Sequence, residues 1–256
     1  MTPNLNKLPP RDQMIMGIHA IRELLIHAPE RILRIYTVKS TQDRKSDILA
    51  SCQKAQIPVV FLALSELTKM AGSDSHQSFV AHVKGRKFWD LREFFKEIEE
   101  KDSSLVLMVD QIFDPQNFGS LIRSAECLGA DAIIWSKNRG TDLTPTAAKS
   151  SSGASELLPL LRVSNLAETA ETFKKEGFEI VASLLEPKAE SLDTFRFAPK
   201  TVLILGSEGE GIQPLLQKRS DRLVYIPMQG KIESLNVAQA AAILLYSAAT
   251  QMRHQG

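Results

Sequence analysis

Residues 105–110 read Leu-Val-Leu-Met-Val-Asp, an apolar run that has no polar residue before its last position. A run without alternation is typical of a strand buried on both faces, as in a parallel sheet covered by helices on each side. Similar runs follow at residues 132–135, 179–183, 202–205 and 223–226, with helical patterns between them. This repetition predicts an α/β domain over residues 105–256 with a mostly parallel sheet.

The preceding part of the chain predicts a smaller α/β domain at residues 14–83. Helical and strand-like patterns alternate there, and we expect one of its helices to be capped by Ser65. Residues 84–104 are interpreted as a linker and a helix that leads into the larger domain. The polar, Pro-rich residues 1–13 are interpreted as a disordered tail.

The charge of the chain is unevenly distributed. The net charge is only +1, but 13 basic and 7 acidic residues occur up to Lys87, so the N-terminal third carries an excess of six positive charges. A basic segment favours a polyanionic partner, although an ordinary solvated surface would explain the same excess. The hydrophobic share of 43% is sufficient for a substantial core.

Cysteine and histidine patterns argue against a disulfide framework and against a metal site. The two cysteines lie far apart, neither belongs to a CxxC pair, and the five histidines have no metal-ligand spacing. No signal peptide is visible, and the apolar run at residues 237–249 is too short to span a membrane. We therefore expect a reduced, cytoplasmic protein that uses no metal.

The first segment with chemical potential follows the strand that ends at Asp110. An Asp-Pro turn leads into a helix that begins near Asn117 and carries Arg123. In open α/β sheets, ligands bind outside the carboxyl ends of the strands, so both side chains are predicted to lie near a ligand site. The alternative interpretation is a capped helix with a surface arginine.

Two further segments follow buried strands. A Gly-rich loop begins at Gly206, but it lacks both the GK[ST] ending of a phosphate-binding loop and the GxGxxG dinucleotide spacing, which excludes a nicotinamide-dependent dehydrogenase. Residues 226–237 lead into a long helix that Ser234 or Asn236 could cap. The same polar groups beside an apolar wall could instead orient an adenosine-like ligand.

Taken in order, the three segments resemble the three motifs of the SpoU (TrmH-type) RNA 2′-O-ribose methyltransferases of the SPOUT superfamily. They contain the forms D-P-x-N-x-G-x-x-x-R-x-A, G-x-E-x-x-G and I-P-M-x-G-x-x-x-S-L-N-V. Residues 17–21 extend the resemblance to the family's substrate-binding domain, which is similar to ribosomal protein L30. The two-domain layout most resembles the large-subunit (23S) rRNA guanosine 2′-O-methyltransferases.

This resemblance implies a homodimer that transfers a methyl group from S-adenosyl-L-methionine (SAM) to a ribose 2′-hydroxyl of RNA. It also implies a deep C-terminal trefoil knot, which rests on the family alone because knots are almost absent from other proteins. Residues implied to contact SAM are Leu205, Gly206, Ile226, Met228, Leu235 and Asn236. Residues implied in catalysis are Arg123, Glu208, Asn117, Ser234 and Asn236.

The resemblance suggests a role for each catalytic residue. A guanidinium is a strong donor and a poor base, so Arg123 is interpreted as a phosphate clamp that organises the transition state. Glu208 would orient Arg123 or accept a proton. The remaining polar residues (Asn117, Ser234 and Asn236) would fix the ribose and the cofactor.

Other functions remain open at this point. A tRNA 2′-O-methyltransferase and an antibiotic-resistance rRNA methyltransferase share the motifs, although the basic first domain favours rRNA. A catalytically silent RNA-binding or ribosome-assembly protein of the same fold is the alternative from a different class. The presence of all proposed catalytic residues argues against that alternative.

Overall fold

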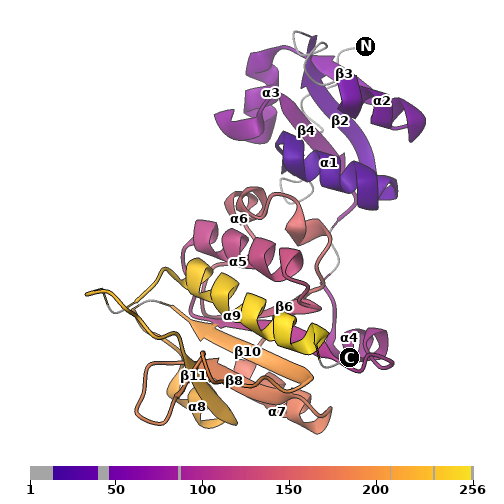
Figure 1. Cartoon of the computed structure of the whole chain (residues 1–256). Coiled ribbons are helices and arrows are strands. Elements are labelled where there is room, and N and C mark those ends of the chain that lie inside the picture. The colour runs from indigo at the N-terminus through magenta and orange to yellow at the C-terminus, as the bar shows by residue number, and fades with distance from the viewer. Residues whose placement is uncertain (1–13, 40–45, 86–87, 208, 233, 255–256) are drawn as a thin grey trace.

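The computed structural model describes residues 14–39, 46–85, 88–207, 209–232 and 234–254, which form two α/β units (Figure 1). The N-terminal unit lies against one end of the larger C-terminal unit. Helix α6 (Pro145–Ser150) and the turn that follows it lie between α5 (Pro115–Cys127) and the N-terminal unit. The two units are therefore in direct contact as well as joined by the chain.

The N-terminal unit is built on a four-stranded mixed sheet of order β1-β4-β2-β3. The central strands β4 (Phe79–Val83) and β2 (Ile32–Val38) are antiparallel, β1 (Met14–Met16) is antiparallel to β4, and β3 (Val59–Leu62) is parallel to β2. Helices α1 (Ile18–His27) and α2 (Ser46–Lys54) cover one face, and α3 (Leu64–Ala71) covers the other. Successive side chains of a strand point to opposite faces of the sheet, so β2 contributes apolar side chains to both faces. Ile35 packs toward α1 and the adjacent Tyr36 packs toward α3.

The expected capping of α3 by Ser65 is wrong. The helix begins at Leu64 with Ala63 as its N-cap residue, so Ser65 lies inside the first turn. The side chain of Glu66 reaches back instead, and its Oε2 accepts the backbone N–H of Ala63 at 3.0 Å. This reciprocal contact from the third helical residue satisfies a backbone donor at the helix start without a capping hydroxyl.

The segment between the units contains helix α4 (Leu91–Glu97), which belongs structurally to the larger unit. Asp90 caps it by accepting the backbone N–H of Glu93 at 2.9 Å. Phe94 is fully buried and packs against Phe173 of α7 (Leu166–Lys175), with ring centroids 5.9 Å apart. Helix α4 is therefore anchored to the C-terminal core.

The C-terminal unit is a seven-stranded parallel sheet of order β7-β6-β5-β10-β8-β11-β9, which confirms the predicted parallel α/β architecture. Its strands are β5 (Ser104–Asp110), β6 (Ala132–Ser136), β7 (Leu160–Val163), β8 (Glu179–Ser183), β9 (Glu190–Ser191), β10 (Lys200–Gly206) and β11 (Arg222–Tyr225). Strand β10 lies between β5 and β8, both of which precede it in the chain. The polypeptide thus returns late to the centre of the sheet.

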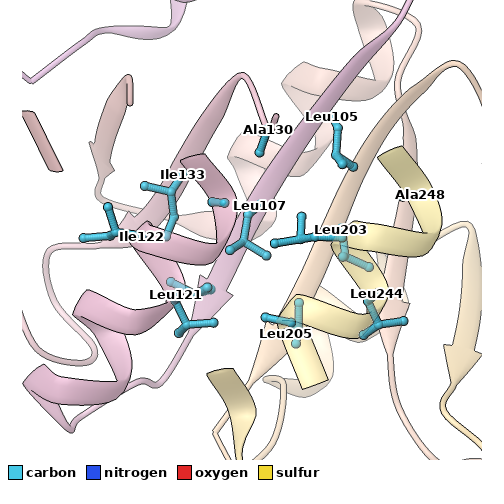
Figure 2. Packing of buried hydrophobic residues seen from close by; sticks show 14 of the residues in the cluster. Leu105, Leu107, Leu121, Ile122, Ala130, Ile133, Leu203, Leu205, Leu244 and Ala248 are labelled. Carbon is cyan, nitrogen blue, oxygen red and sulfur yellow. The ribbon is translucent and has the colours of Figure 1, made fainter. Parts of the chain in front are cut away.

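Both faces of this sheet are covered, which explains the uninterrupted apolar run of β5. Its odd-numbered residues face α5 and the long α9 (Val237–Arg253), and its even-numbered residues face α4, α7 and α8 (Pro214–Lys218). Figure 2 shows Leu107 and Leu203 of the central strands between Leu121 of α5 and Leu244 of α9. Each fully buried leucine stabilises the fold by about 1.5–3 kcal/mol relative to exposure, before entropy is counted.

Candidate active site

A pocket of about 650 Å³ opens at the carboxyl ends of β10, β8 and β11. Ser234 from the predicted catalytic set lines this pocket. Five of the six residues predicted to contact a cofactor line it as well, namely Leu205, Gly206, Ile226, Met228 and Leu235. Three chain segments about 20–50 residues apart in sequence therefore converge on one hollow, since β8 contributes Ser183 to the same wall. The pocket is the point where the second and third motifs meet.

Gly206 ends β10 at a place where no larger residue fits. A Cβ at this position would lie 2.2 Å from the backbone C and O of Gly211 and 2.5 Å from the N of Ile212. The loop folds back on itself there, because Ser207 and Gly211 form an antiparallel bridge and the N–H of Gly211 donates to the carbonyl of Ser207 at 3.0 Å. The predicted catalytic residue Glu208 belongs to this loop but lies outside the described residues.

A buried carboxylate, that of Asp110, hydrogen-bonds to the residue Gln213 that follows the same loop. The carboxylate of Asp110, the last residue of β5, accepts two hydrogen bonds from Gln213. One comes from the backbone N–H of Gln213 at 2.9 Å and the other from its side-chain Nε2 at 3.0 Å. Burial raises the pKa of the Asp110 carboxyl above its ordinary value, and the hydrogen bonds from Gln213 oppose that shift. Arg139 continues the network by donating to Oε1 of Gln213 at 2.7 Å.

Sequence reasoning missed this network. The sequence pattern marks Asp110 only as the end of a strand, and Gln213 lies 103 residues further along the chain. The available signal was a carboxylate directly after a fully apolar strand, which has to find donors when it is buried.

The third motif joins the first through two asparagines. Asn236 caps α9 by accepting the backbone N–H of Ala238 at 2.9 Å, which confirms one of the two expected capping residues. Its Nδ2 donates to Oδ1 of Asn117 at 3.0 Å. Asp114 in turn caps α5 by accepting the backbone N–H groups of Gln116 and Asn117. The side chain of Asn236 is thus directed to α5, and its neighbours Leu235 and Val237 line the pocket.

Arg123 does not line this pocket. Its Nη1 donates to the hydroxyl of Ser152 at 3.3 Å, and its side chain lines a second hollow of about 290 Å³. Helix α1 of the N-terminal unit forms part of that hollow through His19 and Glu23. The structure therefore brings together the predicted cofactor contacts and the Asn117–Asn236 pair, whereas Arg123 opens on the boundary between the two units.

Neither a membrane helix nor a metal cluster is found in the part of the chain that the structure describes. No helix among those residues has the length and apolar character needed to cross a membrane. No group of three or more His, Cys, Asp or Glu side chains is arranged there to hold a metal ion.

Comparison with known proteins assigns the family. Residues 104–246 match the SpoU rRNA Methylase family, and residues 14–89 match the RNA 2′-O ribose methyltransferase substrate binding domain. The chain belongs to the SpoU rRNA methylase family. The resemblance inferred from the three sequence motifs is thereby confirmed.

Relatives of this SpoU-family chain match it over almost their whole length. The 23S rRNA (guanosine-2′-O-)-methyltransferase RlmB of Acinetobacter baylyi is 35% identical over 237 residues, which cover 92% of this chain and 96% of the relative. The RlmB protein of Escherichia coli is 35% identical over 240 residues, which cover 93% of this chain and 98% of the relative.

A solved SpoU structure has the same two-unit arrangement. The SpoU methyltransferase AviRb from Streptomyces viridochromogenes, determined in complex with the cofactor AdoMet (SAM), superposes with a TM-score of 0.75 at 25% identity. The superposition covers 95% of this chain and 91% of AviRb. The similarity therefore includes the N-terminal unit as well as the C-terminal one.

Proposed function

We propose that this protein transfers the methyl group of SAM to the ribose 2′-hydroxyl of a guanosine in 23S rRNA. The observation that carries the proposal is the single pocket into which residues of the second and third SpoU motifs converge. Support for the substrate comes from the RlmB relatives, which are named for this reaction and match the chain nearly end to end. Support for the methyl donor comes from AviRb, which binds it.

The pocket suits SAM in size and in chemistry. Its volume of about 650 Å³ lies within the range common for cofactor sites. Leu205, Ile226 and Leu235 offer apolar contact for an adenine ring, and the tight turn at Gly206 lets backbone groups approach the ligand closely. Ser183 and Ser234 add hydroxyl groups that can hydrogen-bond to the polar parts of the ligand.

The reaction is one in which positioning outweighs charge stabilisation. When bound, SAM supplies an electrophilic methyl group, which the ribose 2′-oxygen takes in line while the carbon–sulfur bond breaks and leaves a neutral thioether. The hydroxyl proton has to leave to a base or to water. The chain's task is therefore to orient the 2′-oxygen and to exclude competing water.

The polar residues of the motifs carry that task in this proposal. Asn117 and Asn236 hydrogen-bond to each other at the junction of α5 and α9. Ser234, two residues before Asn236, lines the pocket. Arg123 clamps a backbone phosphate of the RNA in the hollow that it shares with α1. Glu208 orients Arg123 or accepts the proton, a role assigned on the sequence motif alone.

The same proposal includes the larger organisation of the molecule. Residues 14–83 bind RNA, residues 84–104 connect, and residues 105–256 hold the catalytic domain with a trefoil knot. The trefoil knot is proposed from membership of the SpoU family alone. A homodimer is supported by the outer face of α9, where Ile243 and Tyr246 are 41% and 59% exposed on a helix whose other side is core. A cytoplasmic location is part of the same proposal and is supported by the bacterial RlmB relatives.

The experiment that tests the function is transfer of labelled methyl groups from SAM to unmodified total rRNA and, separately, to unmodified tRNA. Nuclease mapping then identifies the labelled nucleotide. Label on a 2′-O-methylguanosine of 23S rRNA is the expected result. Label confined to tRNA would refute the substrate, and absence of SAM binding would favour the catalytically silent alternative.

A further inference from the structure

The turn at residues 151–157, here called the docking turn, is a contact point between the two units. It follows α6 and contains the 3₁₀ helix η6 (Ala154–Glu156). Buried Ser151 stabilises it from inside, since its hydroxyl donates to the carbonyl of Ala148 at 2.7 Å and accepts the N–H of Ser155 at 3.3 Å. The docking turn is thus a fixed feature of the C-terminal unit.

One side of the docking turn contacts Arg123. Ser152 accepts the hydrogen bond from Nη1 of Arg123 at 3.3 Å, and its backbone φ is +52°. A serine in this left-handed region is strained by about 1 kcal/mol or more relative to glycine. Ser152 therefore places its hydroxyl beside Arg123 although its own backbone conformation is one that glycine would adopt more readily.

The other side of the docking turn contacts the N-terminal unit. Gly153 has a φ of +101°, and a Cβ there would lie 3.0 Å from Cβ and Cγ of Glu23 and 3.2 Å from Cα of Ala20, both on α1. The absence of a side chain lets α1 pack directly on the backbone of the turn. Ser152 and Gly153 are consecutive in the chain. A single peptide bond therefore links Ser152, which contacts Arg123, to Gly153, which contacts α1.

A buried ion pair fixes the same contact. Nη2 of Arg31 lies 2.8 Å from Oε2 of Glu156, whose side chain is only 1% exposed, and Nη1 of Arg31 donates to the Glu156 carbonyl at 3.4 Å. Within the docked arrangement each charge compensates the other, so substitution of either residue alone would leave a buried charge unpaired. The N-terminal unit therefore packs in one defined position on the turn.

We propose that the N-terminal unit positions Arg123 through the docking turn, with Ser152 as the positioning residue and Gly153 as the seat of α1. This inference rests on the proposed function, in which Arg123 clamps an RNA phosphate. A free arginine side chain samples many rotamers, and a hydrogen bond that it donates to a fixed hydroxyl restricts them before RNA arrives. The N-terminal unit thus acts on the reaction as well as on RNA affinity.

Ser152→Gly separates this role from a merely structural one. Glycine relieves the left-handed strain but removes the acceptor, so the unfolding midpoint stays equal or rises while the single-turnover methylation rate falls about tenfold. SAM affinity stays within about twofold, because Ser152 lies outside the cofactor pocket. Ser152→Asn, which tolerates the left-handed region and keeps an acceptor oxygen, restores most of the rate. If the methylation rate of each variant changed in parallel with its unfolding midpoint instead, the role of Ser152 would be overturned.

Gly153→Ala tests the part played by the N-terminal unit, with Gly177→Ala as the matched control. Both glycines have positive φ, at +101° and +83°, so alanine introduces similar backbone strain at each. A Cβ at Gly177 meets nothing within 4 Å, whereas one at Gly153 meets α1. Only Gly153→Ala is expected to slow methylation at saturating RNA. Equal effects of the two substitutions would overturn the coupling through α1.

Nuclear magnetic resonance of the arginine Nε–H groups gives a readout that does not depend on activity. The Arg123 signal, assigned with Arg123→Lys, is expected to be rigid in the wild type and in Gly177→Ala. It becomes mobile in Ser152→Gly and in Gly153→Ala. An unchanged Arg123 signal in both variants would refute the positioning proposal. A wild-type protein with a rigid Arg123 but no transfer to rRNA would refute the proposed function alone.

Discussion

Nδ2 of Asn236, the N-cap residue of α9, donates to Oδ1 of Asn117 in the first turn of α5, and the two atoms are 3.0 Å apart. The bond joins positions that are 119 residues apart and that belong to the first and the third SpoU motif. Because Leu235 and Val237 line the pocket, the same bond fixes the backbone on either side of Asn236. The packing of α5 on α9 thereby sets the shape of the cofactor wall.

Replacing Asn236 by alanine is expected to weaken both the fold and the binding of SAM. Loss of the cap on α9 costs about 1 kcal/mol of unfolding free energy. Loss of the donor to Asn117 frees the pocket wall, so SAM affinity falls at least about tenfold, since a lost hydrogen bond and a mobile segment together amount to about 1.4 kcal/mol. Chemical unfolding and calorimetry measure the two effects.

Asn165→Ala is the matched control for that prediction. Asn165 caps α7 by accepting the N–H groups of Ala167 and Glu168, but it does not line the cofactor pocket. We expect a similar loss of stability and unchanged SAM affinity. If both substitutions weakened SAM binding equally, the effect would be a general consequence of instability.

Gly206→Ala tests the tight turn at the end of β10. A Cβ at 2.2 Å from backbone atoms of Gly211 forces the loop outward, so we expect a loss of about 1–3 kcal/mol in unfolding free energy and weaker SAM binding. Gly209→Ala lies in the same loop, but a Cβ there meets nothing within 4 Å. Its unfolding midpoint should therefore match that of the wild type, and a comparable loss in both would contradict the steric explanation.

The parts of the fold that the sequence predicted are those whose burial leaves a pattern. Strand β5 is buried on both faces, so its apolar run was visible, and the same reasoning found β6, β8, β10 and β11. Strand β9 has only two residues, Glu190 and Ser191, at the sheet edge. Its position depends on backbone pairing and on the ion pair between Glu190 and Arg222, which leave no apolar period.

The candidate site was predicted in part for a similar reason. The pocket residues were found because their motifs follow strand ends, and parallel strands end at one edge of the sheet. The hollow around Arg123 was not, because it depends on how α1 docks on the turn at Gly153. Such a contact between units is set by three-dimensional packing and by one ion pair, Arg31 with Glu156, whose partners are 125 residues apart.

The pH dependence of stability tests the state of Asp110. Its folded pKa is raised above the unfolded value, so the folded protein binds the proton more tightly and this residue's contribution to stability falls as pH rises above about 4. Asp110→Asn removes that titration. The difference in unfolding free energy, wild type minus variant, should therefore decrease between pH 4 and neutrality in urea titrations. A difference that increases with pH would mean that the hydrogen bonds from Gln213 outweigh burial.

Substitution of Ile243 and Tyr246 by glutamate tests the proposed homodimer. Both side chains lie on the exposed face of α9, and charges there would have to be buried unpaired in an interface. We expect the wild type to have about twice the mass of one chain in light scattering, and the double variant to be monomeric with native helix content. Ile26→Glu, at a position of α1 that is 69% exposed, is the control that should stay dimeric. A monomeric wild type would refute the dimer directly.

Arg123→Ala decides what the guanidinium contributes. Because Arg123 does not line the cofactor pocket of its own chain, we expect SAM affinity to stay within about twofold in calorimetry. Loss of a preorganised cationic donor at the phosphate should lower the methylation rate on the order of 10²–10³-fold. Arg123→Lys keeps the charge but loses the forked geometry, so it should recover only part of the rate. Loss of SAM binding together with activity would refute the clamp, because it would mean that Arg123 supports the pocket itself.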